Sequence, residues 1–426
     1  MALLTSLGLL VLALLRTPLF VIIAAAALLG FYRAGIDLSA VSIEFYRLAE
    51  MPILLAIPLF TFAGYLLSES QAALRLVRVT EALLGWMPGG LAIVALLACA
   101  FFTAFTGASG VTIVALGALL VPAMARAGYR ENFSLGLVTT SGSLGLLFAP
   151  SLPLILYAVI SQQLGVSQPV TVDDMFLAGI FPGILMLSLL SIWVVWVNRS
   201  QPLKRFSAAE AGAALWEARW EIPLPFIVLG GIYTGYFAVS EAAAVTALYV
   251  LIVEVGIYRE VTWRKLPAVM REAMILVGAI LIILGMSLAS TNYLIDAGVP
   301  AKLFALLKAH ISDKLTFLLL LNLFLLFLGM MLDIFSAMVI MVPLLLPIAT
   351  GYQIHPLHLG IIFLANMQLG YFTPPVGMNL FIASYRFKKP VMQLYRATLP
   401  FFIILLLCVL IITYWPALSL RLAGKG

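Results

Sequence analysis

Two interrupted apolar stretches decide the fold: FFTAFTGASG (101–110) followed by GLLFAP (145–150), and GMMLD (329–333) followed by GYFTPP (370–375). In each of them, small or helix-breaking residues stand in the middle of long apolar sequence. Lipid offers no water to hydrogen-bond freed backbone groups, so such interruptions persist only where protein or a water-filled cavity covers them. We therefore expect both stretches to lie inside a membrane protein, around a shared binding site.

The two stretches are related by a constant shift along the chain. Pro122 and Gly145 are separated by the same distance in sequence as Pro347 and Gly370, and Gly145 and Pro150 by the same distance as Gly370 and Pro375. The shift in residue number from Gly145 to Gly370 therefore carries the whole first stretch onto the second. We call this shift the repeat offset. It predicts a duplicated unit, with residues 1–215 as the first copy and 216–426 as the second.

The composition places the chain in a membrane. Hydrophobic residues make up 64% of the sequence and charged residues only 10%, against about 25% charged in soluble proteins. Long apolar segments favour spanning helices, and the alternating pattern of a β-barrel is absent from the sequence. We expect an all-α polytopic membrane protein with about 10–11 transmembrane helices and two re-entrant hairpins.

The same order of elements is expected in both copies. An amphipathic arm (33–50 and 259–272) belongs to the scaffold of each copy, and apolar segments open the chain at 3–15 and 18–31. Each copy also contains an apolar run of about forty residues, at 86–127 and at 312–350. Each run could be two ordinary spans, but the small residues at its centre favour a re-entrant hairpin. The elements expected are scaffold helices within 1–85, hairpin 86–127, broken helix 132–160 and span 176–197, then scaffold helices 222–294, hairpin 312–350, broken helix 357–385 and span 396–418.

The distribution of basic residues tests the orientation of the two copies. Five spans and one hairpin per copy is an odd number of crossings, which inverts the second copy. Assigning loops alternately to the two sides puts 17 of the 24 Lys and Arg residues on one side and 7 on the other. The positive-inside rule makes the first side cytoplasmic. Both termini are then outside, in the periplasm of a Gram-negative cell, and the two hairpins enter from opposite faces.

Inverted repeats with discontinuous helices are the architecture of secondary transporters. A half-helix N-terminus suits a carboxylate, whereas a half-helix C-terminus and unwound carbonyls suit Na⁺, with Ser and Thr hydroxyls completing the shell. Such hydroxyls accompany both interruptions, including Ser143, Ser151, Ser336 and Thr373. The candidate substrate contacts are Thr106, Ser109, Thr112, Ser141, Asp333 and Asn379.

Each of these features also has a plain structural explanation. Gly and Pro in spanning helices often only allow kinks or close packing, although four interruptions paired at one spacing favour a site. Asp333 could be a functional intramembrane acid or a cap on a half-helix, and the sequence leaves both open. Glu241 is expected to be a helix-start carboxylate, and Glu254 to lie at the membrane interface. The net charge of +6 reflects basic cytoplasmic loops rather than a nucleic-acid partner.

At these residues the chain resembles the large membrane subunit of tripartite ATP-independent periplasmic (TRAP) transporters, within the ion-transporter superfamily. The resemblance covers essentially the whole chain. It is carried by MPILLAIPLF (51–60), GIFPG (179–183), SEAAAV (240–245), GMMLD (329–333) and, most specifically, TPPVGMNLF (373–381).

The resemblance implies a mechanism and partners. A periplasmic binding protein would deliver a small organic anion, such as a C4-dicarboxylate or sialic acid. A small four-helix membrane subunit, expected as a separate chain, would dock on the scaffold. Na⁺ would drive uptake by an elevator motion of the hairpins and broken helices, with no enzymatic activity and no cofactor besides this ion.

Family-like Na⁺ sites would lie where each hairpin tip meets its broken helix. For the second copy the resemblance implies Gly329, Gly370, Thr373 and Val376. The repeat offset carries these to Ala104, Gly145, Phe148 and Ser151, with Gly107 as the nearer tip glycine. Many family members have an Asp just after the first tip where this chain reads SGVT (109–112), so the substrate stays open.

Two other functions compete with this interpretation. The nearest is a stand-alone Na⁺/dicarboxylate carrier that needs no binding protein. The other is a scaffold subunit of a larger membrane complex that transports nothing. No phosphate-binding Gly-Lys-Ser/Thr loop accompanies the apolar segments, which argues against ATP hydrolysis by this chain.

Overall fold

The computed structural model describes residues 17–165, 168–199 and 206–425. The apolar segment expected at 3–15 lies outside these residues. The described chain is helical, with eight helices long and apolar enough to cross a membrane, or nine if the bent pair α8–α9 counts as one span. Four further apolar helices, α2, α6, α12 and α18, are shorter. The all-α polytopic fold is therefore confirmed. The expected 10–11 transmembrane helices are reached only if some of these shorter helices are counted as spans.

The first copy contains a helical arm, a helical hairpin and a broken helix. Amphipathic helix α3 forms the arm, and α6 and α7 form the hairpin. Helix α8 with the short turn η2, followed by α9, forms a broken helix bent by 40° at the break between Leu147 and Leu152. The helices are α2 (Leu19–Ala34), α3 (Ser39–Ala49), η1 (Pro52–Leu55), α4 (Ala56–Glu69), α5 (Ala72–Leu84), α6 (Gly90–Thr106), α7 (Ser109–Arg126), α8 (Glu131–Ser141), η2 (Leu144–Leu147), α9 (Leu152–Gln163), α10 (Val172–Val197) and α11 (Ala208–Glu217).

The second copy contains a matching hairpin, α16 and α17, and a matching broken helix, α18 and α19. Its helices are α12 (Pro223–Tyr233), α13 (Val239–Leu251) with the π-helical turn η3 (Ile252–Ile257), α14 (Leu266–Asp296), α15 (Val299–His310), α16 (Lys314–Met331), α17 (Ile334–Gly351), α18 (Pro356–Gly370), α19 (Met378–Phe387), α20 (Val391–Tyr414) and α21 (Ala417–Leu420).

The helix bounds follow the spacing found in the sequence. Shifting α7 by the repeat offset gives 334–351, the bounds of α17, and shifting α6 gives 315–331, which differs from α16 only at the first position. Cis peptide bonds precede Pro150 and Pro375, which are also related by the repeat offset. Whether each hairpin re-enters the membrane, and whether the second copy is inverted, stay predictions.

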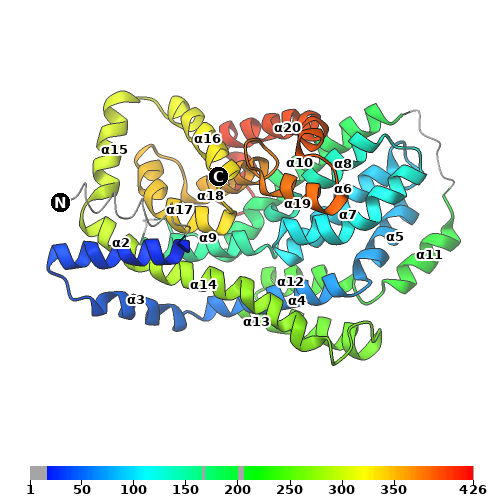
Figure 1. Ribbon diagram of the computed structural model, residues 1–426, viewed down its shortest axis with the longest axis horizontal. Helices are drawn as coiled ribbons and strands as arrows, with labels where there is room; N and C mark the ends of the chain where they lie inside the picture. Colours follow the sequence, from blue (N-terminus) through cyan, green and yellow to red (C-terminus); the bar gives the residue numbers. More distant parts are fainter. Residues whose placement is uncertain (1–16, 166–167, 200–205, 426) are drawn as a thin grey trace.

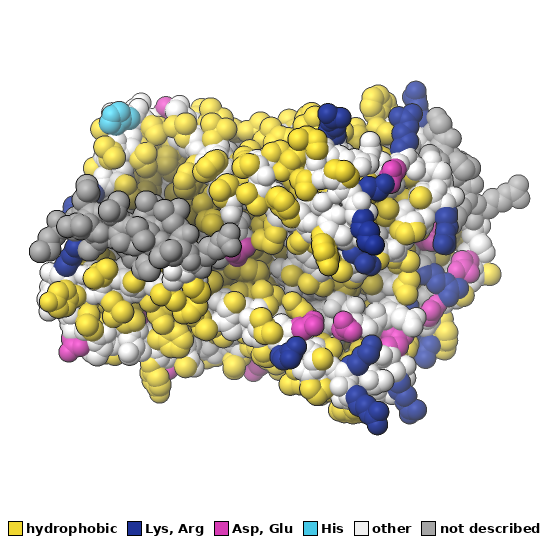
Figure 2. All heavy atoms as spheres, viewed as in Figure 1, with side chains coloured by type: hydrophobic (Ala, Val, Ile, Leu, Met, Phe, Trp, Pro, Cys, Tyr) yellow, Lys and Arg dark blue, Asp and Glu magenta, His cyan; other side chains and the backbone are white. Residues whose placement is uncertain are grey.

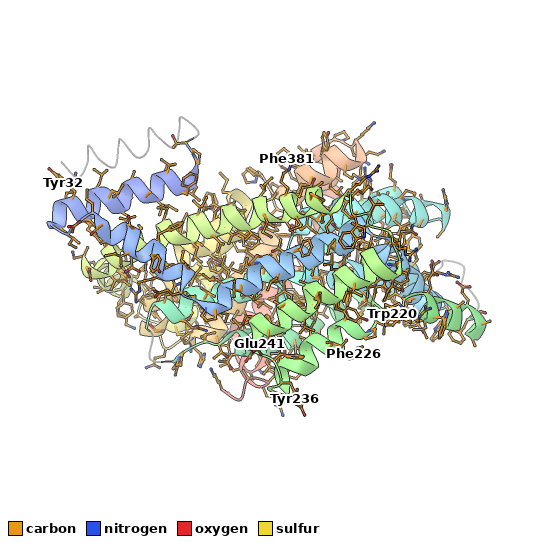
Figure 3. All side chains as sticks on the ribbon, turned by 90° about the horizontal axis from the view of Figure 1, so that it is seen from below. Tyr32, Trp220, Phe226, Tyr236, Glu241 and Phe381 are labelled. Carbon is orange, nitrogen blue, oxygen red and sulfur yellow. The ribbon has the colours of Figure 1, made fainter. Side chains whose placement is uncertain are left out.

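The helices pack around one large apolar core. Helix α14 runs across much of the molecule and packs against α2 and α4, while α8 packs against α20 and α16 against α18 (Figure 1). On the face shown in Figure 2, hydrophobic side chains cover most of the surface, and Lys and Arg gather toward the end where α5 and α11 lie. Tyr32, Phe226 and Tyr236 are 74%, 74% and 82% exposed and lie at the periphery in Figure 3, as lipid- or headgroup-facing aromatics do.

The second arm differs from its prediction. The sequence suggested an arm at 259–272 and a separate helix at 273–294, but residues 266–272 of the arm and all of 273–294 belong to the single 31-residue helix α14. In the first copy Pro52 begins a new turn after α3, because proline cannot continue a helix from within it. The repeat offset carries Pro52 to Val277, so the helix continues.

Two glycines in spanning helices provide a test of this packing. A Cβ atom on Gly136 of α8 would lie 2.1 Å from the carbonyl oxygen of Ala397 on α20, whereas one on Gly278 of α14 would meet open space. We expect Gly136→Ala to destabilise the fold by about 1–3 kcal/mol through overpacking, and Gly278→Ala to change stability by less than about 1 kcal/mol. Unfolding of the purified protein in detergent measures both, and equal effects would contradict this packing.

Candidate functional site

The first hairpin tip lies against its own broken helix. Helix α6 ends at Thr106, Gly107 turns the chain with φ of +64°, and α7 begins at Ser109. A Cβ on Gly107 would lie 2.7 Å from the side chain of Leu152, the first residue of α9. Only glycine combines this φ with so close an approach.

The backbone of the broken helix touches the hairpin one turn before the tip. A Cβ on Gly145 would lie 2.1 Å from the carbonyl oxygen of Ala100 and 2.5 Å from the amide nitrogen of Ala104. Two of the residues assigned to a first cation site, Ala104 and Gly145, are thus in direct backbone contact. The hydroxyl of Thr103 strengthens the contact by donating to the Gly142 carbonyl at 2.9 Å.

The second hairpin repeats this contact. A Cβ on Gly370 would lie 2.5 Å from the carbonyl carbon of Gly329, so the two glycines pack backbone against backbone. The amide of Gly377 donates to the carbonyl of Met330 at 3.1 Å, which ties the far side of the break to the tip. The backbone at the two breaks also matches, because Phe148 donates to Gly145 and Thr373 to Gly370, each at 3.0 Å.

A cavity of about 350 Å³ lies between the two tips and helix α14. One wall comes from the first tip, with Gly107, Ser109 and Gly110, and another from the second hairpin, with Asp333 and Ser336. The α14 wall is apolar and consists of Leu276, Ala279, Ile280 and Ile283. Among the described residues that line it, Asp333 is the one charged side chain. Residues on the two tips, far apart in sequence, therefore share one cavity.

Asp333 is a helix cap that also faces this cavity. Its Oδ1 atom accepts hydrogen bonds from the amides of Phe335 and Ser336, each at 3.0 Å, at the start of α17. The buried hydroxyl of Tyr371 accepts from the amide of Ile334 at 2.7 Å. Both readings of Asp333 that the sequence left open are thus compatible with its position, since the cap uses only one carboxylate oxygen.

Two hydrogen bonds of Asn379 join the two copies beside the cavity. The hydroxyl of Ser109 donates to Oδ1 of Asn379 at 2.8 Å, and the amide group of Asn379 donates to the carbonyl of Thr139 at 3.3 Å. Asn379 is fully buried. These two predicted substrate contacts therefore bind each other, which places the start of α7 against the start of α19.

The other predicted residues differ in their surroundings. Thr112 bonds the hydroxyl of Thr103 at 2.6 Å, and Ser141 donates weakly to its own helix at 3.4 Å. Thr373 donates to the carbonyl of Leu369 at 2.7 Å. The Phe148 ring packs at Gly183 on α10, and the side chain of Val376 is 38% exposed, so only their backbone could serve a cation site.

Two hydroxyls near the first tip have no hydrogen-bond partner among the described residues. The Oγ1 atom of Thr106 and the Oγ atom of Ser151 are both fully buried. Thr106 precedes the tip glycine, and Ser151 precedes Leu152, which the tip contacts. A buried polar atom without a partner is costly, and a cation or water bound between the tip and α9 would satisfy both.

Sequence reasoning missed several residues of this site. Thr103 carried no signal beyond its place in an apolar helix, although it bonds both Thr112 and Gly142. Tyr371 stood inside a motif that drew attention to its neighbours Gly370 and Thr373. The α14 wall could not be recognised, because an apolar stripe facing a cavity reads like one facing lipid.

Comparison with known proteins decides the family. The profile described as "Tripartite ATP-independent periplasmic transporter, DctM component" matches residues 6–418. The chain belongs to the DctM family. A "C4-dicarboxylate TRAP transporter large permease protein DctM" from Pseudomonas aeruginosa is 35% identical over 386 residues, covering 90% of this chain and 89% of the relative.

Two further relatives extend the comparison. The "Isethionate TRAP transporter permease protein DctMQ" of Oleidesulfovibrio alaskensis is 34% identical over 96% of this chain, and the match spans only 64% of that longer protein. Among solved structures, the YdaH transporter of Alcanivorax borkumensis has the same fold, with a TM-score of 0.61, 14% identity, and 90% and 89% coverage of the two chains. The chain is therefore a multi-pass large permease component of a TRAP transporter.

The hydrogen bond between Ser109 and Asn379, which joins the two repeats within this DctM chain, can be tested by a double-mutant cycle. We expect Ser109→Ala and Asn379→Ala to be coupled by roughly 0.5–1.5 kcal/mol, the net worth of a buried hydrogen bond. The measurement is the free energy of unfolding in detergent for both single variants and the double variant. As a matched control, Ser109→Ala should be additive with Thr398→Ala, since Thr398 bonds only within α20. Additivity of the Ser109 and Asn379 changes would contradict the contact.

Proposed function

We propose that this chain is the membrane transport subunit of a Na⁺-driven importer of small organic anions. A periplasmic binding protein would deliver the anion, and the hairpins with their broken helices would carry it across by an elevator motion. The observation that carries the proposal is the cavity of about 350 Å³ shared by the two hairpin tips, next to the breaks between α8 and α9 and between α18 and α19. Discontinuous helices at a repeat interface are where secondary transporters bind substrate and coupling ion.

The charge of the cavity supports coupling to a cation. An organic anion entering it meets the carboxylate of Asp333 and, among the described lining residues, no Lys, Arg or His. Bringing an anion into such a site is costly unless positive charge enters with it. Na⁺ bound beside the tips would supply that charge, with ligands drawn from the buried oxygens of Thr106 and Ser151 and from carbonyls at Gly145, Gly329 and Gly370.

One contact supports a two-fold relation between the copies. The hydroxyl of Ser143 donates to the carbonyl of Gln368 at 3.3 Å, and the repeat offset carries one of these positions onto the other. When two copies are related by a two-fold axis, a residue that touches its own counterpart must lie close to that axis. The axis would then pass between the two breaks, so that the two hairpins could alternate in opening the site to either side.

Localisation and partners follow from the same proposal. We place the chain in the bacterial inner membrane with the end rich in Lys and Arg in the cytoplasm (Figure 2), and both termini in the periplasm. A separate small membrane subunit would complete the complex. The isethionate relative differs, because it is a longer polypeptide named DctMQ.

Reconstitution tests this function against its two rivals. The purified large subunit is placed in vesicles with and without the small subunit and the binding protein, and uptake of radiolabelled organic acids is measured with and without a Na⁺ gradient. We expect uptake only with all components and inward Na⁺. Uptake by this chain alone would favour a stand-alone carrier, and no uptake of any acid that the binding protein retains would favour a scaffold.

Removal of the Ser151 hydroxyl tests whether the first tip binds a cation or is only well packed. Ser151→Ala removes a buried oxygen beside the first tip, and we expect the Na⁺ concentration for half-maximal uptake to rise roughly tenfold, as for the loss of one ligand worth about 1.4 kcal/mol. Ser161→Ala is the matched control, because its hydroxyl is also buried without a partner among the described residues but lies near the far end of α9. An unchanged Na⁺ requirement in Ser151→Ala would remove Ser151 from the cation site.

A further inference from the structure

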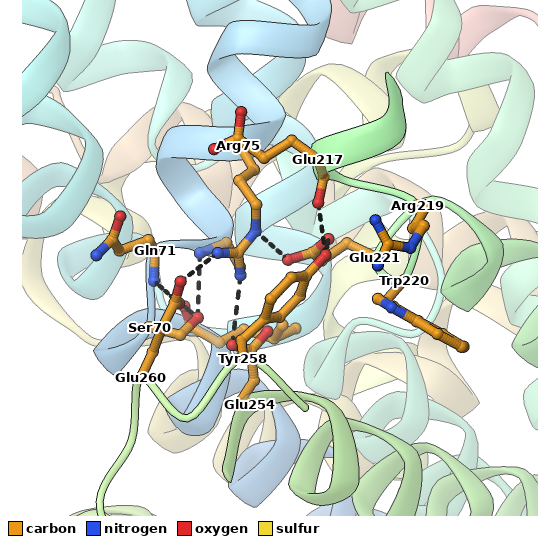
Figure 4. A network of polar contacts seen from close by, with 12 residues as sticks. Ser70, Gln71, Arg75, Glu217, Arg219, Trp220, Glu221, Glu254, Tyr258 and Glu260 are labelled. Carbon is orange, nitrogen blue, oxygen red and sulfur yellow. Dashed lines mark hydrogen bonds and ion pairs between the residues drawn. The ribbon is translucent and has the colours of Figure 1, made fainter. Parts of the chain in front are cut away.

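A buried charged cluster lies away from the cavity, on the approach to the first hairpin. It consists of Arg75 on α5, Glu221 just before α12, Glu254 in η3 and Glu260 after η3, and we call it the Arg75 cluster (Figure 4). The side chains of Arg75, Glu221 and Glu254 are 4%, 3% and 0% exposed. Glu254, which the sequence predicts at the membrane interface, is buried within the protein, because η3 turns it inward toward α5.

Two of the three carboxylates are well satisfied. Glu221 accepts from Nε of Arg75 through one oxygen, and its other oxygen lies 3.2 Å from the Tyr258 hydroxyl, which also donates to the Glu217 carbonyl at 2.5 Å. Glu260 accepts from Nη1 of Arg75 through Oε1 and from the Gln71 amide, at 2.7 Å, through Oε2. The centre of the Tyr258 ring lies 4.0 Å from the guanidinium carbon. The one positive charge of the cluster is thus already shared by two carboxylates.

Glu254 is the deepest member and the least satisfied. Its Oε2 atom makes one long contact, 3.4 Å, with Nη2 of Arg75, and its Oε1 atom has no hydrogen-bond partner among the described residues. The Ser70 hydroxyl at the end of α4 also lies beside it. If all three carboxylates were ionised, the cluster would hold three negative charges and one positive charge in a largely buried site.

We propose that Glu254 is a proton-binding site and is protonated in the folded protein at neutral pH. A buried carboxylate that lacks its own counter-charge takes up a proton instead of remaining ionised. Glu221 and Glu260 repel a third negative charge, and Arg75 cannot offset all three. Glu260, whose side chain is 18% exposed, is the member through which the cluster reaches solvent.

The bound proton would stabilise one particular connection. Helix α5 leads directly into the first hairpin, and the Arg75 cluster ties it to the end of α13 and to the link before α12 (Figure 4). The repeat offset carries Arg75 to Pro300 at the start of α15, so the second hairpin has no equivalent arginine there. Loss of the proton would add an uncompensated charge to this connection alone and loosen it at alkaline pH.

Replacing single carboxylates with their neutral isosteres tests this proposal. Melting temperatures of the full-length protein, purified with its small subunit, are measured from pH 6 to pH 9.5. We expect Glu254→Gln to match the unsubstituted protein at pH 7, because glutamine resembles a protonated glutamate, and to lose less stability at pH 9.5. Glu221→Gln should lower the melting temperature at pH 7 by roughly 5 °C. Glu217→Gln, in an exposed pair with Arg78, is the matched control and should change little.

Two outcomes would overturn the proposal. Glu254→Gln could destabilise the protein at pH 7 as strongly as Glu221→Gln does, which would mean that Glu254 is ionised and paired. Alternatively, the alkaline loss of stability could be the same with and without Glu254. Should the variant fail to fold, infrared spectroscopy of the unsubstituted protein decides instead: we expect a carboxylic acid carbonyl band at pH 7 that disappears at alkaline pH. Its absence at pH 7 would contradict a protonated Glu254.

Discussion

The structure depends on covering the backbone where helices are broken inside the membrane. Two broken helices leave amides and carbonyls that lipid cannot satisfy, and in both copies glycine lets a hairpin approach within backbone contact. Gly145 packs against Ala100 and Ala104, and Gly370 packs against Gly329. Because the cover comes from hairpins that end at the breaks, the two tips lie close together, and one cavity is lined by residues of both hairpins.

The same arrangement explains why a mostly apolar cavity could serve charged cargo. Backbone groups at helix breaks and tips offer both partial charges without an ionisable side chain. Asp333 uses one oxygen to cap α17 and faces the cavity while doing so. Ser109 and Asn379 bind each other across the copies. The polar side chains thus position helix ends, and under the proposed function backbone groups would be the main ligands for the ion.

Much of the helix arrangement could be predicted, because a helix break inside a membrane is visible as small residues within a short apolar stretch of sequence. Four glycines interrupt apolar sequence: Gly107, Gly145, Gly329 and Gly370. The spacing of the interruptions predicted matching helices in the two copies. The sequence could not reveal that α14 lines the cavity, since its apolar residues have no polar signature. Nor could it reveal that Glu254 is buried, because that burial depends on the π-helical turn and on Arg75 from a distant helix.

The central claim is that the two hairpins approach one site from opposite faces of the membrane. Labelling with a membrane-impermeant maleimide tests it most directly, using single cysteines at exposed positions at the base of each hairpin, Ala125→Cys and Ser312→Cys, after replacement of the buried Cys99 and Cys408. In intact spheroplasts Ser312→Cys should react, whereas Ala125→Cys should react only after the membrane is permeabilised. Reaction of both cysteines from the same side would contradict the inverted arrangement.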